Sequence, residues 1–528
     1  MKVLITDKIN EAAVKIVSDV AEVDNLPTMD EEELCKIIAN YDALLVRSQT
    51  KVTAKIIEAA ANMKIIGRAG VGVDNIDLDA ATKKGIIVVN SPDGNTNAAA
   101  EHTIAMMMAM SRNIPAADNS VKQGLWERSK FTGVELFGKT LGVIGFGKIG
   151  QHVAQVALSL GMKLVVNDPY ATKEYVEKFG GKYIEHLDDF WNIPDFITIH
   201  TPKTKETTSL INTNTINRMK KGVRIINCAR GGIIDEQALA SAIEQGQVAG
   251  AAIDVYEDEK NVQNSPLLKL GNKIVLTPHL GASTSEAQIN VALDVAEQVK
   301  EVLSGGDATS AVNIPALKPQ KLEPVKEYMP IAESIAKIAS EILDSNLRGI
   351  KIEVKGSLAN LDVSPLEVAV LKGVLSANLV GVNYVNAPLI AKQREIDVTV
   401  QKSQQTTDYI GSISVKLLTD KEDVEVSGAL IAAGIEKIVK LNDYITSIDP
   451  DKYMLLVPHK NKPNMIGQVA SVLGCDNVNI SKMQVAQKNE AKDDISLMII
   501  NTDDVVEAST IEKINKIDGV IQAKFIKL

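Results

Sequence analysis

The sequence predicts an α/β protein of two doubly wound, Rossmann-like domains, followed by an α+β domain and a C-terminal βαββαβ domain. Short β-branched runs alternate with helical patterns, glycine-rich turns join several of them, and 528 residues exceed what one core organises. At about 150 residues per domain, this length corresponds to three or four domains. The composition, 45% apolar and 23% charged, excludes disordered and fibrous classes.

Charge and cysteine content narrow the class of partner. The net charge is −10, which disfavours a nucleic-acid or anionic-membrane partner and favours small molecules. The three cysteines lie far apart without metal-ligand spacing, so we expect a reduced, cytoplasmic protein with no zinc. Met1 and Lys2 are followed by VLIT rather than by a signal-peptide pattern, and no apolar run approaches the ~20 residues that span a bilayer.

Four segments follow from the patterns. The runs KVLIT, ALLV, KIIG and IIVV predict parallel strands up to about residue 92, and a second series from TLGVIGF to KIVLTP follows. A helix from about Ser285 leads into SGGDATSAVNIPALKP, which marks a boundary near residue 316, and the helical segments on both sides of the second series allow it to be inserted into the first domain. Residues 317–451 form a less regular α+β module, and residues 452–528 follow the split βαβ order.

Two glycine motifs lie close together. Gly133 to Thr140 matches a Walker A pattern, but it runs directly into a strand instead of a helix, so we interpret the match as accidental. Gly145, Gly147 and Gly150 form GxGxxG with a strand before it and a helix after it, which predicts a dinucleotide site. Asp168 ends the next strand, where a carboxylate binds the ribose hydroxyls and repels a 2′-phosphate; NAD is therefore favoured over NADP.

Charged residues stand just past several predicted strands, where ligands of such sheets bind. They are Arg47, Arg68, Arg230, Asp254 and His279. Several arginines around one crevice indicate a substrate with more than one anionic group. The other histidines have simpler interpretations: His102 as a core or interface residue, His200 as a packing residue, and His152 and His186 as surface positions.

The blocks GRAGVGVDNID, NSPDGNTNAAAEHT, LGVIGFGKIG, NCARGGIIDEQAL and TPHLGAST together resemble the D-2-hydroxyacid dehydrogenases. Within that family the chain is similar to the long branch that acts on phosphoglycerate. The resemblance implies oxidation of D-3-phosphoglycerate with NAD, the first committed step of L-serine biosynthesis. It also implies a substrate-binding domain (1–96 and 285–316), an NAD-binding domain (97–284), an intervening domain (317–451), an ACT regulatory domain (452–528) and a homotetramer.

The resemblance also implies roles for single residues. The catalytic set corresponds to Arg230, Glu259 and His279, although Lys260 replaces the family's Pro and leaves Glu257 and Asp258 as weaker alternatives. The cofactor contacts correspond to Gly145, Gly147, Lys148, Ile149, Gly150, Asp168, Thr201, Cys228, Arg230, Asp254, His279, Gly281 and Ala282. The substrate contacts correspond to Arg47, Ser48, Arg68, Gly70, Asn95 and Arg128, the last of which would serve a neighbouring subunit. Val71 stands where some members have Thr.

Feedback by L-serine is expected at the C-terminal domain. Serine-sensitive relatives bind it between paired ACT domains, through residues that correspond to His459, Asn461 and Asn479. Asn464 and Glu395 each stand where the family commonly has Gly. Two alternatives stay open: another 2-hydroxyacid dehydrogenase, acting on glycerate, lactate or erythronate phosphate, and an NAD-sensing corepressor of the same fold. The role of the 317–451 domain is open, beyond a possible anionic effector.

Overall fold

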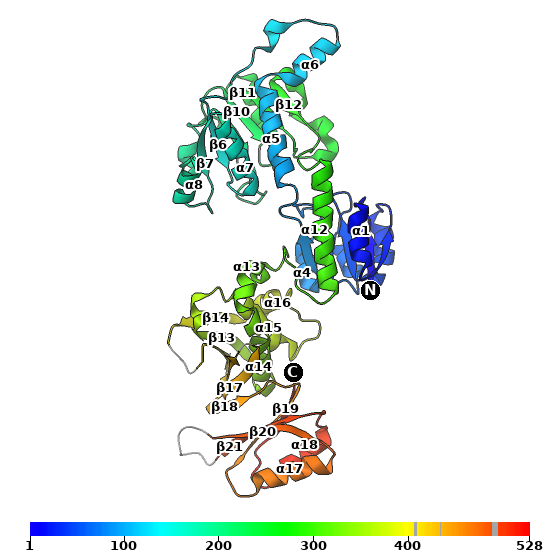
Figure 1. The fold of residues 1–528 in the computed structure, drawn as a ribbon, viewed down its shortest axis with the longest axis vertical. Coiled ribbons are helices and arrows are strands. Elements are labelled where there is room, and N and C mark those ends of the chain that lie inside the picture. The colour runs from blue at the N-terminus through cyan, green and yellow to red at the C-terminus, as the bar shows by residue number, and fades with distance from the viewer. Residues whose placement is uncertain (406–408, 433, 488–494) are drawn as a thin grey trace.

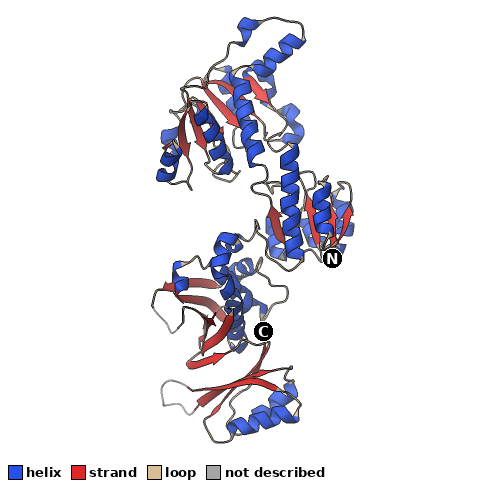
Figure 2. Ribbon diagram, in the orientation of Figure 1, coloured by secondary structure: helices blue, strands red, loops and turns tan. Residues whose placement is uncertain are grey.

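The computed structural model describes residues 1–405, 409–432, 434–487 and 495–528. They form four sheets that follow one another along the long axis of the molecule (Figures 1 and 2). No helix in these ranges combines the length and the apolar character needed to cross a membrane. The fold class expected from the sequence is therefore observed.

The first sheet is parallel, in the order β2-β1-β3-β4-β5. Its strands are β1 (Lys2–Ile5), β2 (Glu22–Asn25), β3 (Ala43–Val46), β4 (Ile65–Arg68) and β5 (Ile87–Asn90). Its helices are α1 (Glu11–Ser18), α2 (Glu31–Ile37), α3 (Ala54–Ala59) and α4 (Leu78–Lys84). Apart from the edge strand β2, which has no buried residue, the strands are largely buried, as expected for a parallel sheet covered on both faces.

The second sheet is also parallel, in the order β12-β11-β10-β9-β6-β7-β8. Its strands are β6 (Thr140–Ile144), β7 (Lys163–Asn167), β8 (Lys182–Tyr183), β9 (Phe196–Ile199), β10 (Val223–Asn227), β11 (Val248–Ile253) and β12 (Ile274–Leu276). Its helices are α5 (Thr96–Ser111), α7 (Lys148–Ser159), α8 (Lys173–Phe179), α9 (Leu187–Phe190), α10 (Thr213–Ile216) and α11 (Glu236–Glu244). The strand order reverses between β6 and β9, and this switch point is where such sheets bind dinucleotides.

Helix α12 (Ser285–Leu303) returns the chain from the second sheet to the first. Val295 and Val299 pack in one core with Val3 and Ile5 of β1. The second sheet therefore lies within the chain that builds the first, and the long helix joins the two (Figure 1).

The apolar helix EHTIAMMMAM is covered only in part by its own chain, because Glu101 and Ala105 are exposed. Met106, Met107 and Met110 are buried against the chain's own second sheet and α7. Large exposed apolar side chains lie on α6 (Ile114–Lys122) and the segment after it, which project from this part of the molecule (Figure 1). Trp126 is 85% exposed and Val121 is 58% exposed.

The third sheet is mixed, in the order β14-β13-β15-β16-β17-β18. Its strands are β13 (Leu347–Gly356), β14 (Asp397–Ser403), β15 (Gly411–Thr419), β16 (Val424–Ala432), β17 (Ile435–Leu441) and β18 (Tyr444–Ile448). The helices of this module are α13 (Pro319–Leu322), α14 (Met329–Ile342), α15 (Ser364–Ser376) and α16 (Ala387–Gln393). Glu395 follows α16 with φ 55°, so the backbone there has the left-handed conformation that glycine adopts most easily.

The fourth sheet is antiparallel, in the order β20-β21-β19-β22, and the chain order is βαββαβ as predicted. Its elements are β19 (Tyr453–Lys460), α17 (Met465–Cys475), β20 (Ile480–Gln487), β21 (Ile495–Thr502), α18 (Ala508–Asn515) and β22 (Lys524–Lys527). One face packs under α17 and α18, and the other joins the core of the third sheet through Leu456 and Ile499. Asn464, at φ 68°, adopts the left-handed conformation in place of glycine.

Candidate active site

The GxGxxG turn has the geometry of a dinucleotide site. Gly145 has φ 90°, and a Cβ there would lie 2.6 Å from the His200 carbonyl oxygen. A Cβ on Gly150 would lie 2.2 Å from the Gly145 carbonyl oxygen, whereas one on Gly147 would meet open space. Helix α7 begins one residue after Gly147, so its free N–H groups face that space. The Walker A match, by contrast, ends in strand β6, as predicted.

The surroundings of this turn fit NAD. Asp168 follows β7, and its carboxylate accepts hydrogen bonds from the backbone N–H groups of Phe146 (2.5 Å) and Tyr170 (2.6 Å), so it lies beside the turn. Among the described residues, the buried hydroxyl of Thr201 has no hydrogen-bond partner, which leaves it available to a ligand. Lys148 instead reaches across to Asp93 of the first module at 2.6 Å, on the wall of a cavity of about 740 Å³ that Ile149 and His200 also line.

His200 lies at the edge of this cavity, beside the GxGxxG turn. Its Nε2 atom is 2.9 Å from the Thr198 hydroxyl, and burial lowers the pKa of His200 to about 4. A neutral imidazole held by its own strand agrees with the packing role expected from the sequence.

The first module supplies a cluster of arginines. Arg68 ends β4, and its buried Nε has no hydrogen-bond partner in the part of the chain that the structure describes. Burial, followed by the charges of Arg230 and Arg47, lowers the pKa of Arg68 to about 10. Gly70 lets the Arg68 guanidinium lie close to the backbone, because a Cβ at this position would be 1.7 Å from it. Asn95, at the start of α5, has a buried Oδ1 without a partner, whereas Ser48 is exposed. These are the features of an anion site.

Arg230 comes from the second module and meets the first. Its Nε lies 3.4 Å from Asp74, and a Cβ on Gly72 would be 2.4 Å from its guanidinium. Asp74 is a partner that sequence reasoning missed, although it stands in the GRAGVGVDNID block. Arg230 thus places a guanidinium, whose planar fork can bind a carboxylate at two points, beside residues of the first module.

His279 and Glu259 form a pair. Glu259 Oε1 lies 2.8 Å from His279 Nδ1, and this hydrogen bond raises the pKa of His279 above its usual value. The alternative acids are engaged elsewhere: Glu257 accepts from the Glu236 backbone, and Asp258 caps the turn that holds Lys260. Replacement of the family's Pro by Lys260 therefore leaves Glu259 in contact with the histidine. Nε2 of His279 is left to face a substrate.

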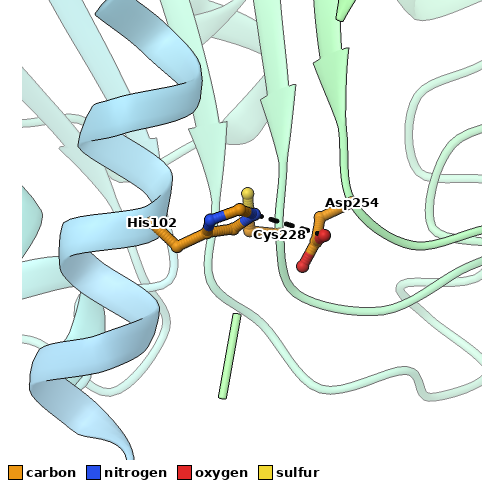
Figure 3. Close-up of side chains that lie close together, drawn as sticks. All are labelled: His102, Cys228 and Asp254. Carbon is orange, nitrogen blue, oxygen red and sulfur yellow. Dashed lines mark ion pairs between the residues drawn. The ribbon is translucent and has the colours of Figure 1, made fainter. Parts of the chain in front are cut away.

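Asp254, His102 and Cys228 lie close together (Figure 3). Burial opposes ionisation of Asp254, but hydrogen bonds from His102, Thr277 and Leu280 outweigh it and lower its pKa. Burial raises the pKa of Cys228 to about 12, so its sulfur is a neutral thiol. The core assignment of His102 was therefore incomplete, because its Nε2 lies 3.2 Å from Asp254 Oδ1. Hydrogen bonds thus connect His102 and Asp254 to the residues around them.

The remaining predicted positions are dispersed. Gly281 donates its backbone N–H to Asp254 at 2.9 Å, and the exposed Ala282 follows it in the same loop. Arg128 is exposed on the projecting segment after α6. His152, on α7, is half-buried, and His186, before α9, is exposed.

The predicted effector residues do not meet within one chain. Asn461 follows β19, whose last residue pairs with Ile495 at the start of β21. Asn479 precedes β20, whose first residue pairs with Thr502 at the other end of β21. At ~3.3 Å per residue, the stretch of β21 between these two pairings spans about 23 Å. Only two copies of the domain could bring Asn461 and Asn479 to one ligand.

Comparison with known proteins defines the class. Residues 104–281 match the model of the D-isomer specific 2-hydroxyacid dehydrogenase NAD binding domain, and residues 324–442 match that of the D-3-phosphoglycerate dehydrogenase intervening domain. A solved D-lactate dehydrogenase from Aquifex aeolicus, complexed with NAD and lactic acid, superposes with a TM-score of 0.51 at 31% identity, covering 57% of this chain and 96% of that one. The fold and site are those of an NAD-dependent oxidoreductase.

Full-length relatives define the family. The chain is 46% identical to D-3-phosphoglycerate dehydrogenase of Synechocystis sp., covering 100% of this chain and 95% of that protein. It is 42% identical to D-3-phosphoglycerate dehydrogenase of Methanocaldococcus jannaschii, covering 100% of both. The chain belongs to the D-3-phosphoglycerate dehydrogenase family.

Proposed function

We propose that the chain oxidises D-3-phosphoglycerate to 3-phosphohydroxypyruvate and so opens L-serine biosynthesis. The observation that carries this proposal is the grouping of Arg47, Arg68 and Arg230 beside the His279–Glu259 pair, because the substrate has two anionic groups flanking the carbon to be oxidised. The names of the full-length relatives support the same substrate.

Each residue of the site has its own role in the proposed reaction. His279 Nε2 removes the hydroxyl proton, and Glu259 holds Nδ1 and stabilises the imidazolium that results. Arg230 binds the carboxylate, and Arg47 and Arg68 bind the phosphate. Bound NAD supplies a nicotinamide ring that accepts the hydride from C2. We assign NAD binding to the GxGxxG turn, Asp168 and Thr201, with Cys228 and Asp254 beside the reacting end.

The direct test compares initial rates with D-3-phosphoglycerate, D-glycerate and D-lactate at saturating NAD. We expect kcat/KM to be highest for the phosphorylated substrate by about two orders of magnitude or more, since a phosphate held by two arginines gains about 1.5–3 kcal/mol per charged bond. Equal kcat/KM for glycerate would contradict the phosphate assignment. Absence of any NADH production would favour a binding protein instead.

The His279–Glu259 pair predicts a pH effect. In the oxidation direction His279 must start unprotonated, and Glu259 raises its pKa, so kcat/KM should fall as pH drops through that raised value. Glu259→Gln removes the carboxylate and lowers the pKa of His279, so the acid limb of the kcat/KM profile should move to lower pH. Turnover at the optimum should fall about ten-fold or more, because the ring loses its orienting group. Glu257→Gln is the control, and an unmoved limb in Glu259→Gln would contradict the pairing.

We also propose that the chain forms a homotetramer. The exposed apolar residues of the projecting segment, Ile114, Val121, Leu125 and Trp126, support this, because monomers rarely leave such a group uncovered. Arg128 lies on the same segment, which favours the expectation that it serves a neighbouring subunit. Sedimentation at micromolar concentration should give an oligomeric mass, and a monomeric mass would contradict the proposal.

L-serine is the proposed effector, bound between two copies of the C-terminal domain. The separation of Asn461 from Asn479 predicts complementation: a dimer of one Asn461→Ala chain and one Asn479→Ala chain contains one intact site and one doubly altered site. Each variant alone should show serine inhibition weakened several-fold, and co-assembled variants should partly recover it. No recovery in verified mixed assemblies would contradict a site shared between chains.

We propose one role for each of the four modules. The first module would bind substrate, the second NAD, and the fourth serine, while the third would bind an anionic effector. The three cysteines are unpaired, which supports a cytoplasmic location.

A further inference from the structure

His279 has a backbone conformation that its own residue type does not favour. Its φ is 56°, in the left-handed region that residues other than glycine adopt at a cost. The loop from Thr277 to Gly281 must therefore be held by its surroundings if the imidazole is to keep one position.

Asp254 makes four hydrogen bonds to this loop, besides those that Ile253 and Tyr256 make to Thr277. Its backbone carbonyl accepts from the His279 N–H at 2.9 Å. Its carboxylate accepts from the Thr277 hydroxyl at 2.6 Å, the Leu280 N–H at 2.8 Å and the Gly281 N–H at 2.9 Å. The orientation of the Asp254 carboxylate thus decides the shape of the loop.

Asp254 in turn needs a partner outside the loop. Its side chain is fully buried, and a buried carboxylate requires a compensating donor. In the described part of the chain, the one ion pair that Asp254 makes is with His102, whose Nε2 lies 3.2 Å from Oδ1 (Figure 3). The same nitrogen lies 3.3 Å from the Thr277 hydroxyl. His102 comes from α5, which packs on β11 and β12 from outside the loop.

We propose that His102 is a positioning residue of the active site, whose Nε2 group orients the Asp254 carboxylate and thereby fixes the loop that carries His279. The inference rests on the proposed function, because it takes His279 as the base. A histidine that merely fills space would need only its volume, whereas this role needs a donor at the Nε2 position.

Glutamine and asparagine separate the two roles. The side-chain nitrogen of glutamine reaches the place of the histidine Nε2 atom, whereas that of asparagine ends one carbon short, near Nδ1. His102→Asn should lower kcat about ten- to hundred-fold, because small displacements of a base are costly. The KM for 3-phosphoglycerate should change less than about two-fold, since the arginines of the first module are untouched. His102→Gln should keep kcat within about three-fold of the parent.

The control is His186→Gln, at an exposed histidine of the same module. Equal losses of kcat in His102→Gln and His102→Asn, or no loss in either, would overturn the inference. Should His102→Asn fail to fold, His102→Ala is assayed with and without imidazole: recovery of kcat supports a donor at this position, and no recovery overturns it. His279→Asn is assayed in parallel. Near-normal turnover there contradicts the proposed function, whereas loss there with a fully active His102→Asn contradicts this inference alone.

Discussion

His279→Asn is expected to lose 10²- to 10⁴-fold in kcat, the usual worth of a positioned general base. Asparagine can keep a hydrogen bond to Glu259, because its amide nitrogen lies near the place of Nδ1, but it cannot take a proton. The expected loss corresponds to about 3–5 kcal/mol of transition-state stabilisation. Steady-state rates of NADH formation with 3-phosphoglycerate measure it.

A binding measurement separates lost chemistry from lost structure. The GxGxxG turn and Asp168 lie on other strands, so His279→Asn should bind NADH with a dissociation constant close to that of the parent, by fluorescence titration. His186→Asn is the matched control, because it makes the same exchange at an exposed position. Near-normal turnover in His279→Asn would remove this residue from the mechanism.

Arg68→Ala should raise the dissociation constant of 3-phosphoglycerate about 10- to 150-fold, since a charge-assisted hydrogen bond contributes about 1.5–3 kcal/mol. The guanidinium is buried near two other arginines, and its pKa of about 10 reflects that environment. A phosphate would relieve the repulsion among the three. Arg68→Lys keeps the charge but loses the planar fork, so its loss should be intermediate.

Calorimetric titration of 3-phosphoglycerate checks this series. Arg112→Ala, at an exposed arginine after α5, is the control and should leave substrate affinity unchanged. NADH affinity should also stay unchanged in Arg68→Ala. Equal losses for substrate and cofactor would indicate a folding defect, and unchanged substrate affinity would contradict the phosphate site.

Local patterns predicted the parts of the site that depend on local geometry. The turn around Gly145 follows from residue types at fixed spacing, because only glycine fits its close approaches. The resemblance assigned the catalytic acid to Glu259 although Lys260 replaces the family's Pro, because the family's acid is the fifth residue after the one that corresponds to Asp254. The split βαβ order of the C-terminal domain could be predicted because it depends only on the order of strands and helices along the chain.

Long-range packing produced the features that the sequence did not reveal. His102 meets Asp254 only because α5 lies over strands that are more than a hundred residues away in the sequence. Arg230 and Asp74 are likewise more than a hundred residues apart in the sequence and meet only in the folded chain. Met106, Met107 and Met110 of α5 are covered by the chain's own second module, which periodicity alone cannot reveal, because it does not show which neighbour covers an apolar helix. Asn461 and Asn479 had suitable residue types, but β21 lies between their strands and places them at opposite ends of the sheet.

A structure of the enzyme with NAD and 3-phosphoglycerate bound tests the central claim most directly. The proposed function places the phosphate on Arg47 and Arg68, the carboxylate on Arg230, and the C2 oxygen within hydrogen-bond distance of His279 Nε2. A phosphate bound at Arg230, or a C2 oxygen out of reach of His279, would contradict it.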